Sequence, residues 1–112
     1  MKRACSIVVS ALVLFVAVPA AVAAEGAAPD LKQGEALFSK HCSVCHPGGG
    51  NVINSKKPID RKALESRNIK TPDDIVKVMR NPVAPMVRFD EKTISQADAL
   101  AIGEYILKTF GK

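Results

Sequence analysis

The sequence predicts an all-α fold of three to five short helices joined by long loops. Side chains that cap helices, which are Asp, Ser and Thr, stand directly before several apolar segments with helical spacing. Prolines and glycines gather between those segments, where they favour turns and loops. The sequence shows neither the period-two alternation of a half-buried β-strand nor an internal repeat, so a sheet is not expected.

Two helices are expected in the first half of the mature chain. Asp30 is placed to cap a helix over residues 31–40, and Asp60 is placed to cap a short helix over residues 61–66. The run Pro47-Gly48-Gly49-Gly50-Asn51 lies between them, breaks regular structure and begins a loop. The residues expected to face inward from these helices are Leu31, Gly34, Leu37, Phe38 and Leu64.

Two more helices are expected in the second half. Thr71-Pro72-Asp73-Asp74 combines a capping threonine, a proline at the first helical position and acids in the first turn, and it begins a helix over residues 72–80. Ser95 and Asp98 form a similar start for a helix over residues 96–109. The residues expected to face inward are Ile75, Val78, Met79, Ala99, Ile102, Gly103, Ile106 and Phe110.

The beginning of the chain has the composition of an export signal. A positively charged start and an apolar run over residues 7–18 lead to small residues and a cleavage site after Ala23 or Ala24. We therefore expect residues 1–24 to be a signal peptide and residues 25–112 to form one domain. The mature protein is then expected in the periplasm or an equivalent exported compartment, without stable membrane insertion. The alternative is that the apolar segment is retained as a membrane anchor.

The mature chain is expected to be small and mildly basic. The full sequence of 112 residues carries 16 Lys and Arg against 11 Asp and Glu, and removing Lys2 and Arg3 with the signal leaves 14 against 11. So small an excess, without a long basic run, makes nucleic acid a poor partner. A domain of this length buries a modest core and often needs a disulfide, a metal or a cofactor for stability.

The most informative motif is Cys42-Ser43-Val44-Cys45-His46, the C-x-x-C-H pentapeptide that attaches a c-type haem. Each thiol can add to one vinyl group of the porphyrin, and the adjacent imidazole is carried toward the iron. Export fits this chemistry, because haem attachment to thiols takes place outside the cytosol. A disulfide or a thioredoxin-type pair is an alternative, although the latter needs a preceding strand and a βαβ context. Zinc is the other alternative, but His41 would complete four ligands within six residues, which cannot easily surround one tetrahedral centre.

The axial ligands of such a haem decide what it can do. His46 is the expected proximal ligand, with its other ring nitrogen donating to a backbone carbonyl. A thioether in the sixth position suits the iron to electron transfer, whereas an open position allows gas binding or peroxide chemistry. Met86, which follows Pro85 in a proline-rich loop, is the expected sixth ligand, and Met79 is expected to fill the core. We expect His41 to face solvent.

Taken together, these residues resemble the class I monohaem cytochromes c, and among them the c-six-like subgroup of small bacterial and algal electron carriers. The resemblance spans essentially the whole mature chain, and its most specific part is the haem pentapeptide. The other matching positions are Gly34 and Phe38, the run Gly49-Gly50-Asn51-Val52-Ile53, Pro85-Met86 with Phe89, and Ala101, Tyr105 and Ile106.

The resemblance implies a cytochrome c fold around one haem c, bound covalently through Cys42 and Cys45 and held by His46 and Met86. It implies a soluble monomer that is an electron carrier rather than an enzyme, in a respiratory or photosynthetic chain. Redox partners would dock transiently at an exposed haem edge. Two alternatives remain: an open-site haem protein of peroxidase-like or gas-binding type, and an obligate haem subunit of a larger dehydrogenase or oxidase. The lysines that could steer an acidic partner are Lys56, Lys57, Lys62 and Lys70.

Overall fold

The computed structural model describes residues 29–112, and within this range all regular structure is helical. The elements are α1 (Leu31–His41), η1 (Pro47–Gly49, a 3-10 helix), α2 (Arg61–Ser66), α3 (Pro72–Arg80) and α4 (Gln96–Thr109). The prediction of an all-α fold is therefore confirmed. The predicted signal peptide, residues 1–24, lies outside the described residues. Within the described part of the chain, no helix combines the length and the apolar character needed to cross a membrane.

The four α-helices begin where the sequence predicts, because each start is fixed by a local cap. In every case the side chain before the first turn accepts a hydrogen bond from a backbone N–H of that turn. On α3 the cap is reciprocal, since the Asp74 carboxylate also accepts from the backbone N–H of Thr71, at 3.0 Å. Only the end of α1 differs, by one residue, since it reaches His41. The capping residues are Asp30, Asp60, Thr71 and Ser95.

The core forms where α1 crosses α4. Gly34 is buried at this crossing, and a Cβ at that position would meet the backbone carbonyl of Ala101. One turn later, the buried ring of Phe38 lies 5.4 Å from the ring of Tyr105 and 5.3 Å from that of Phe110, measured between centroids. Close backbone approach and tilted aromatic contacts therefore join the first and last helices of the domain.

The second contact of the core is that of α3 with α4, where Gly103 lets the backbone of Pro72 approach closely. Ile75 and Met79 are buried on α3, as predicted. The prediction for Val78 is wrong in part, because this side chain is only half-buried and lines a cavity, while Val76 is buried against the core. Leu31 was also expected to face inward, yet it is 39% exposed, because it stands one turn before the helix crossing.

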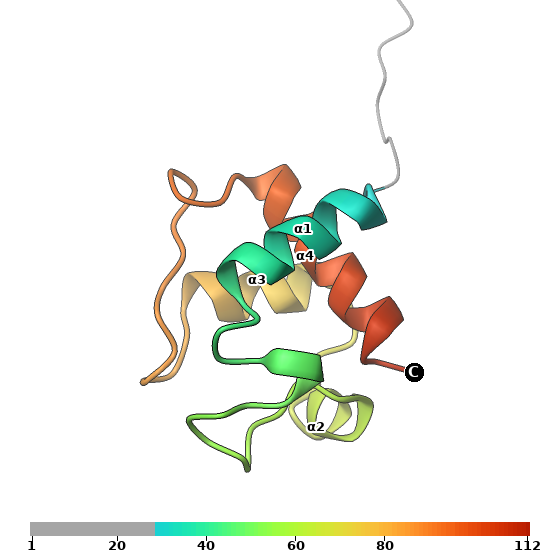
Figure 1. Ribbon diagram of the computed structural model, residues 1–112, viewed down its shortest axis with the longest axis vertical. Helices are drawn as coiled ribbons and strands as arrows, with labels where there is room; N and C mark the ends of the chain where they lie inside the picture. Colours follow the sequence, from blue (N-terminus) through green and yellow to red (C-terminus); the bar gives the residue numbers. More distant parts are fainter. Residues whose placement is uncertain (1–28) are drawn as a thin grey trace, which may run out of the picture.

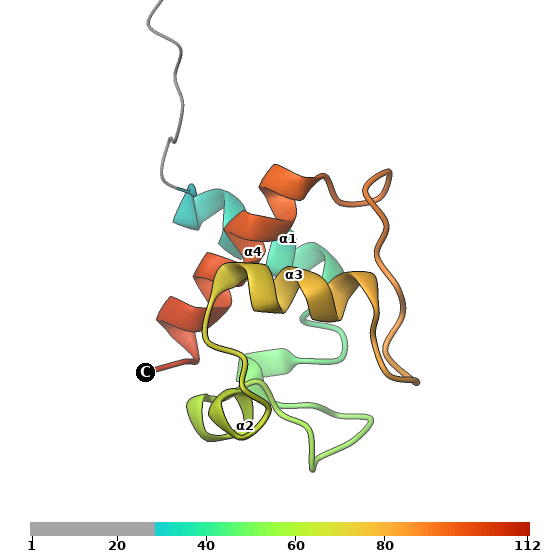
Figure 2. The ribbon, with the colours of Figure 1, turned by 180° about the vertical axis from the view of Figure 1, so that it is seen from behind.

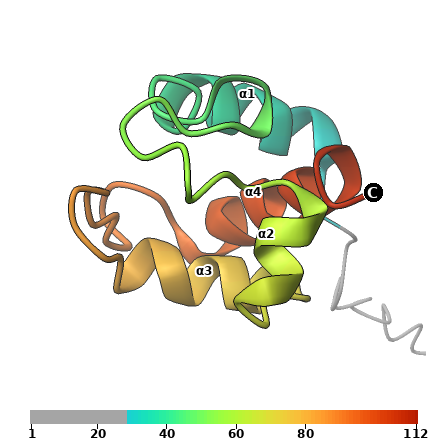
Figure 3. The same ribbon diagram turned by 90° about the horizontal axis from the view of Figure 1, so that it is seen from below.

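The helices leave two long loops on one side of the molecule. Figures 1 and 2 show α2 at one end of the molecule, and Figure 3 shows α4 between α1 and α3. Seen from below, the loop after α1 lies beside α1 and the loop after α3 lies beside α3 (Figure 3). The loop after α1 carries the C-x-x-C-H motif, and the loop after α3 carries Met86. The fold thus brings the two predicted ligand-bearing segments to the same side.

Candidate haem site

A cavity of about 490 Å³ is lined by all four residues that the sequence assigns to the cofactor. Cys42, Cys45 and His46 line it from the loop after α1, and Met86 lines it from the loop after α3. The volume falls within the range of small-molecule and cofactor sites. Further walls come from apolar side chains of α3 and α4, namely Ile75, Val78, Met79, Ile102 and Ile106.

The imidazole of His46 is oriented by a backbone carbonyl. Its Nδ1 lies 2.8 Å from the carbonyl oxygen of Gly50. Because a carbonyl oxygen only accepts, Nδ1 carries the proton and Nε2 retains the lone pair that a metal needs. This is the arrangement that commonly fixes the tautomer and raises the basicity of a metal-bound histidine. The sequence predicts such a carbonyl partner, and the structure identifies it as that of Gly50.

The two thiols are held in one tight turn that also sets the position of His46. The backbone N–H groups of Cys45 and His46 both donate to the carbonyl of Cys42, at 3.1 and 2.9 Å. Both cysteines are free and half-buried. Burial, and secondarily the neighbouring Cys45, raises the pKa of the Cys42 thiol to about 11.

A network of hydrogen bonds supports the loop beneath His46. The side chain of Asn51 accepts from the backbone N–H groups of Ile53 and Asn54, at 3.1 and 2.8 Å, and donates to the carbonyl of Lys57 at 2.9 Å. Within the same loop, the N–H of Val52 donates to the carbonyl of Cys45 at 2.9 Å. The asparagine thus closes the loop on itself immediately after Gly50, the partner of His46.

Both methionines of residues 29–112 line the cavity, and they differ in their surroundings. Met79 is 3% exposed and is packed into the core from α3. Met86 is half-buried in the loop, where its N–H donates to the carbonyl of Val83 at 3.2 Å. The prediction that Met79 fills the core is confirmed. Met86 packs against the edge of the core and is only partly buried, whereas Met79 is part of the core itself.

His41 does not face solvent, and that expectation is wrong. It is half-buried at the end of α1 and lines the cavity. Its ring lies edge-on to the ring of Phe89, with the centroids 6.0 Å apart. Among residues 29–112, no group of three or more His, Cys, Asp and Glu side chains is placed to hold a metal ion. The four closely spaced ligands that the zinc alternative requires are therefore not assembled within this range.

The remaining lining residues suit an apolar group that carries carboxylates. Most of the walls are apolar, and the polar members are cationic or uncharged: Lys57 and Arg67, with amides from Asn51, Asn54 and Asn81. Among residues 29–112, no Asp or Glu lines the cavity. A haem is an apolar plate with two propionates, so the donor set and the charge of this cavity fit it. Sequence reasoning missed Arg67, because an exposed arginine in a loop gives no signal until the path of that loop is known.

Short helices wrapped around an apolar cavity beside a C-x-x-C-H turn define the c-type cytochromes. Comparison with known proteins leads to the same class. The family model described as cytochrome c oxidase, cbb3-type, subunit III, matches residues 29–106. Cytochrome c6 of Cyanidium caldarium is 35% identical over 83 residues, which cover 74% of each chain.

Solved structures agree with this assignment. The outer-membrane cytochrome OmcF of Geobacter sulfurreducens is 43% identical, with a TM-score of 0.67 over 69% of this chain and 98% of that one. Cytochrome c6 of the diatom Phaeodactylum tricornutum is 27% identical, with a TM-score of 0.63 over 70% and 92% of the two chains. The protein therefore belongs to the class I monohaem c-type cytochromes and is similar to cytochrome c6. It is an electron-transfer protein, and its cofactor is haem c, for which Cys42 and Cys45 provide the attachment motif.

Proposed function

We propose that this protein carries single electrons in an exported compartment, with His46 and Met86 as the axial ligands of its haem iron. The observation that supports this most is that both residues line one cavity from loops that follow different helices, α1 and α3. An imidazole nitrogen and a thioether are the ligand pair of a closed, electron-transferring haem. Each of the two loops would then supply one protein ligand of the iron.

The protein holds the ligands so that little has to move when an electron arrives or leaves. When bound, haem supplies a one-electron couple at its iron. The hydrogen bond from His46 to Gly50 keeps the imidazole in one orientation. With haem bound, Met86 would supply a second protein ligand and leave no position open to small ligands, and the apolar walls from α3 and α4 would exclude water. These features favour electron transfer over chemistry at the iron.

We assign partner docking to the exposed part of the cavity wall. Four apolar side chains line the cavity and are nevertheless largely exposed, from Ile53 at 57% to Val44 at 77%; the other two are Val83 and Val87. Exposed apolar patches of this kind mark interaction sites. A small patch suits a redox partner that binds weakly and leaves after each transfer. All four lysines predicted to steer that partner are exposed, and Lys57 lines the cavity itself.

The export part of the proposal depends on the sequence of residues 1–24. A basic start, an apolar run and small residues before Ala23 and Ala24 support cleavage there and release of residues 25–112 as a monomeric carrier in the periplasm. Covalent haem attachment through Cys42 and Cys45 is in keeping with such a compartment.

The family description gives one specific reason to keep a second candidate. The matching model is named for a subunit of a cbb3-type cytochrome c oxidase. In that case the exposed apolar side chains around the cavity would be covered permanently by a larger subunit. Co-purification of the native protein with such a subunit would favour this candidate over a free carrier.

The proposed ligand set is tested by substituting each methionine in the holoprotein. Met86→Ala should abolish the weak charge-transfer band of methionine-ligated ferric haem and let the reduced protein bind carbon monoxide rapidly, while the haem stays attached. Met79→Leu is the matched control, because it nearly conserves volume in the core and should keep the band. Retention of the band in Met86→Ala, or its loss in Met79→Leu alone, would refute the assignment of Met86.

A further inference from the structure

The loop that carries Met86 is fastened mainly at its two ends. Residues 82–88 are all described, and the only hydrogen bond made within them joins the N–H of Met86 to the carbonyl of Val83. Pro82 and Pro85 have no N–H to donate, and Val83 and Val87 are 70% and 63% exposed. Little inside the loop therefore fixes where the Met86 thioether lies.

Arg80 fastens the far end of this loop. It is the last residue of α3, and its Nη1 donates to the carbonyl of Phe89 at 2.9 Å in a partly buried setting. The N–H of the same Phe89 donates to the carbonyl of Met79 at 3.0 Å. Both the backbone N–H and the backbone carbonyl of Phe89 are thus hydrogen-bonded to the end of α3. The eight residues from Asn81 to Arg88 form a closed loop between these anchors.

The surroundings of the Arg80 guanidinium make this anchor strong. Its Nε is buried and has no hydrogen-bond partner among the described residues. Its Nη2 makes only a long contact with the Gln96 side chain, at 3.5 Å. A partly dehydrated guanidinium depends on the few acceptors that it has, and hydrogen bonds from charged donors are stronger than neutral ones. The carbonyl of Phe89 is the nearest of these acceptors.

We propose that Arg80 is a positioning residue for the sixth ligand: by holding the carbonyl of Phe89, it keeps the Met86 loop closed and the thioether at the iron. This inference rests on the proposed function, because it requires Met86 to be the ligand. Arg80 itself does not line the cavity and does not touch the cofactor site. Its effect on the iron is therefore indirect and is measured by how easily Met86 is displaced.

The experiment measures the affinity of the ferric holoprotein for added imidazole, which competes with Met86 for the iron. Arg80→Leu removes the hydrogen bonds to the Phe89 carbonyl and the Gln96 side chain. It should raise the affinity for imidazole about tenfold, the size expected for losing a charged hydrogen bond. Arg80→Lys keeps a charged donor for the Phe89 carbonyl, so its affinity for imidazole should lie between those of Arg80→Leu and the wild type. Arg61→Leu is the control: the Arg61 side chain is 62% exposed on α2 and, within the described residues, pairs only with Glu65, so the imidazole affinity of this variant should equal that of the wild type.

Thermal unfolding of the same proteins separates positioning from simple stabilisation. If Arg80→Leu loses stability but its imidazole affinity stays within about twofold of the wild type, Arg80 is structural only and the inference is wrong. If Arg80→Leu does not fold, Arg80→Lys decides between the same two outcomes. If the wild type lacks the methionine band, the proposed function fails first. If the band is present and disappears in Met86→Ala, an unchanged imidazole affinity in Arg80→Leu overturns the inference about Arg80 and leaves the proposed function standing.

Discussion

The two loops that supply the proposed ligands are held in different ways. The His46 loop, residues 46–59, is tied along its length by the Gly50 carbonyl, the Asn51 side chain and a 2.8 Å bond from the N–H of Ile59 to the carbonyl of Gly49. The Met86 loop, residues 81–88, is held at its ends, where Phe89 bonds to Arg80 and to the carbonyl of Met79. His46 thus lies in a loop that is hydrogen-bonded along its length, whereas Met86 lies in a loop that is hydrogen-bonded mainly at its ends.

This difference indicates which of the two loops opens more easily. Segments with few internal hydrogen bonds and exposed side chains open at lower free energy than the rest of a protein. Both loops have exposed side chains, but the Met86 loop has a single internal hydrogen bond, whereas the His46 loop has several. We therefore expect the thioether to be the exchangeable ligand and the imidazole to be the permanent one. The Met86 and Arg80 substitutions above test the Met86 loop itself. The three substitutions below test the residues that support the two loops.

The largest effect on stability is expected from the helix that leads into the His46 loop. Phe38 is 4% exposed, and its carbonyl accepts from the N–H groups of Cys42 and Ser43. Phe38→Ala leaves a cavity in the core and should lower the free energy of unfolding by about 3–5 kcal/mol. Urea unfolding of the holoprotein, followed by circular dichroism, measures this.

The matched control for Phe38 is Leu31→Ala on the same helix. Leu31 is 39% exposed, so its loss should cost less than about 1 kcal/mol. Equal losses for the two variants would mean that the crossing of α1 and α4 does not support the haem motif.

A smaller effect is expected within the His46 loop itself. Asn51→Ala removes three hydrogen bonds and should cost about 1–2 kcal/mol, because each exposed or half-exposed bond contributes modestly. Amide hydrogen exchange should quicken at Ile53 and Asn54 but not in the Met86 loop.

Asn54→Ala is the control for this substitution, because the Asn54 side chain accepts only one hydrogen bond, from the N–H of Lys56. Exchange that quickened equally in both loops would contradict the idea that they are supported separately.

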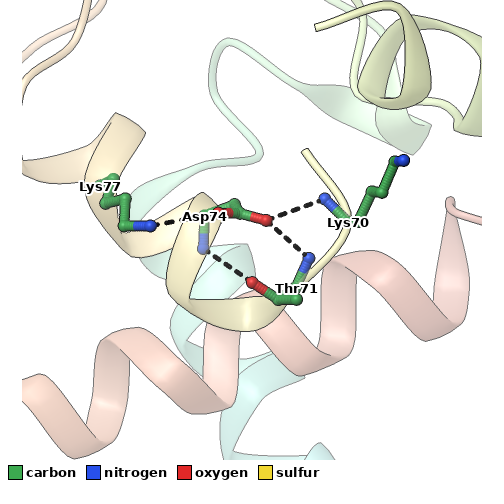
Figure 4. Close-up of polar contacts among 4 residues, drawn as sticks. All are labelled: Lys70, Thr71, Asp74 and Lys77. Atoms are coloured by element: carbon green, nitrogen blue, oxygen red, sulfur yellow. Dashed lines mark hydrogen bonds and ion pairs between the residues drawn. The ribbon is translucent and has the colours of Figure 1, made fainter. Parts of the chain in front are cut away.

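The smallest effect concerns the start of α3, the helix that leads into the Met86 loop. The Asp74 carboxylate accepts hydrogen bonds from the backbone of Lys70 and Thr71 and pairs with Lys77 (Figure 4). These bonds, the one from Lys70 first, lower its pKa from 3.8 to about 2. Because the pKa is lower in the folded state, Asp74 stabilises the fold above about pH 4, and this contribution is lost as the pH falls toward 2.

Asp74→Asn should therefore bring stability closer to the wild type as the pH falls from 4 to 2, in urea unfolding measured at each pH. Asp73→Asn is the control, since within the described structure the Asp73 carboxylate makes no hydrogen bond. A difference between wild type and Asp74→Asn that does not change with pH would show that the cap is not the source of the stabilisation.

Several parts of this protein were predictable because their causes are local in sequence. A cap and the turn that follows it lie within four residues, so Asp30, Asp60, Thr71 and Ser95 predicted the starts of all four α-helices. The C-x-x-C-H pentapeptide predicted the cofactor for the same reason, since attachment and ligation chemistry are contained in five positions. The sequence also predicted that Met86 lies near this motif, but the prediction depended only on its place in a proline-rich loop.

Other parts depend on residues that are distant in sequence, and only the tertiary structure decided them. Helical spacing places Val76 and Val78 on a broad apolar face, and the positions of α4 and the cavity determine which is buried. Loops have no period, so the path of the chain alone puts the Gly50 carbonyl under His46 and the Phe89 carbonyl within reach of Arg80. The sequence by itself determined the helices and the haem motif, because their causes are short-range; the tertiary structure decided which backbone carbonyls hold the two loops that carry His46 and Met86, because those contacts depend on the path of the chain.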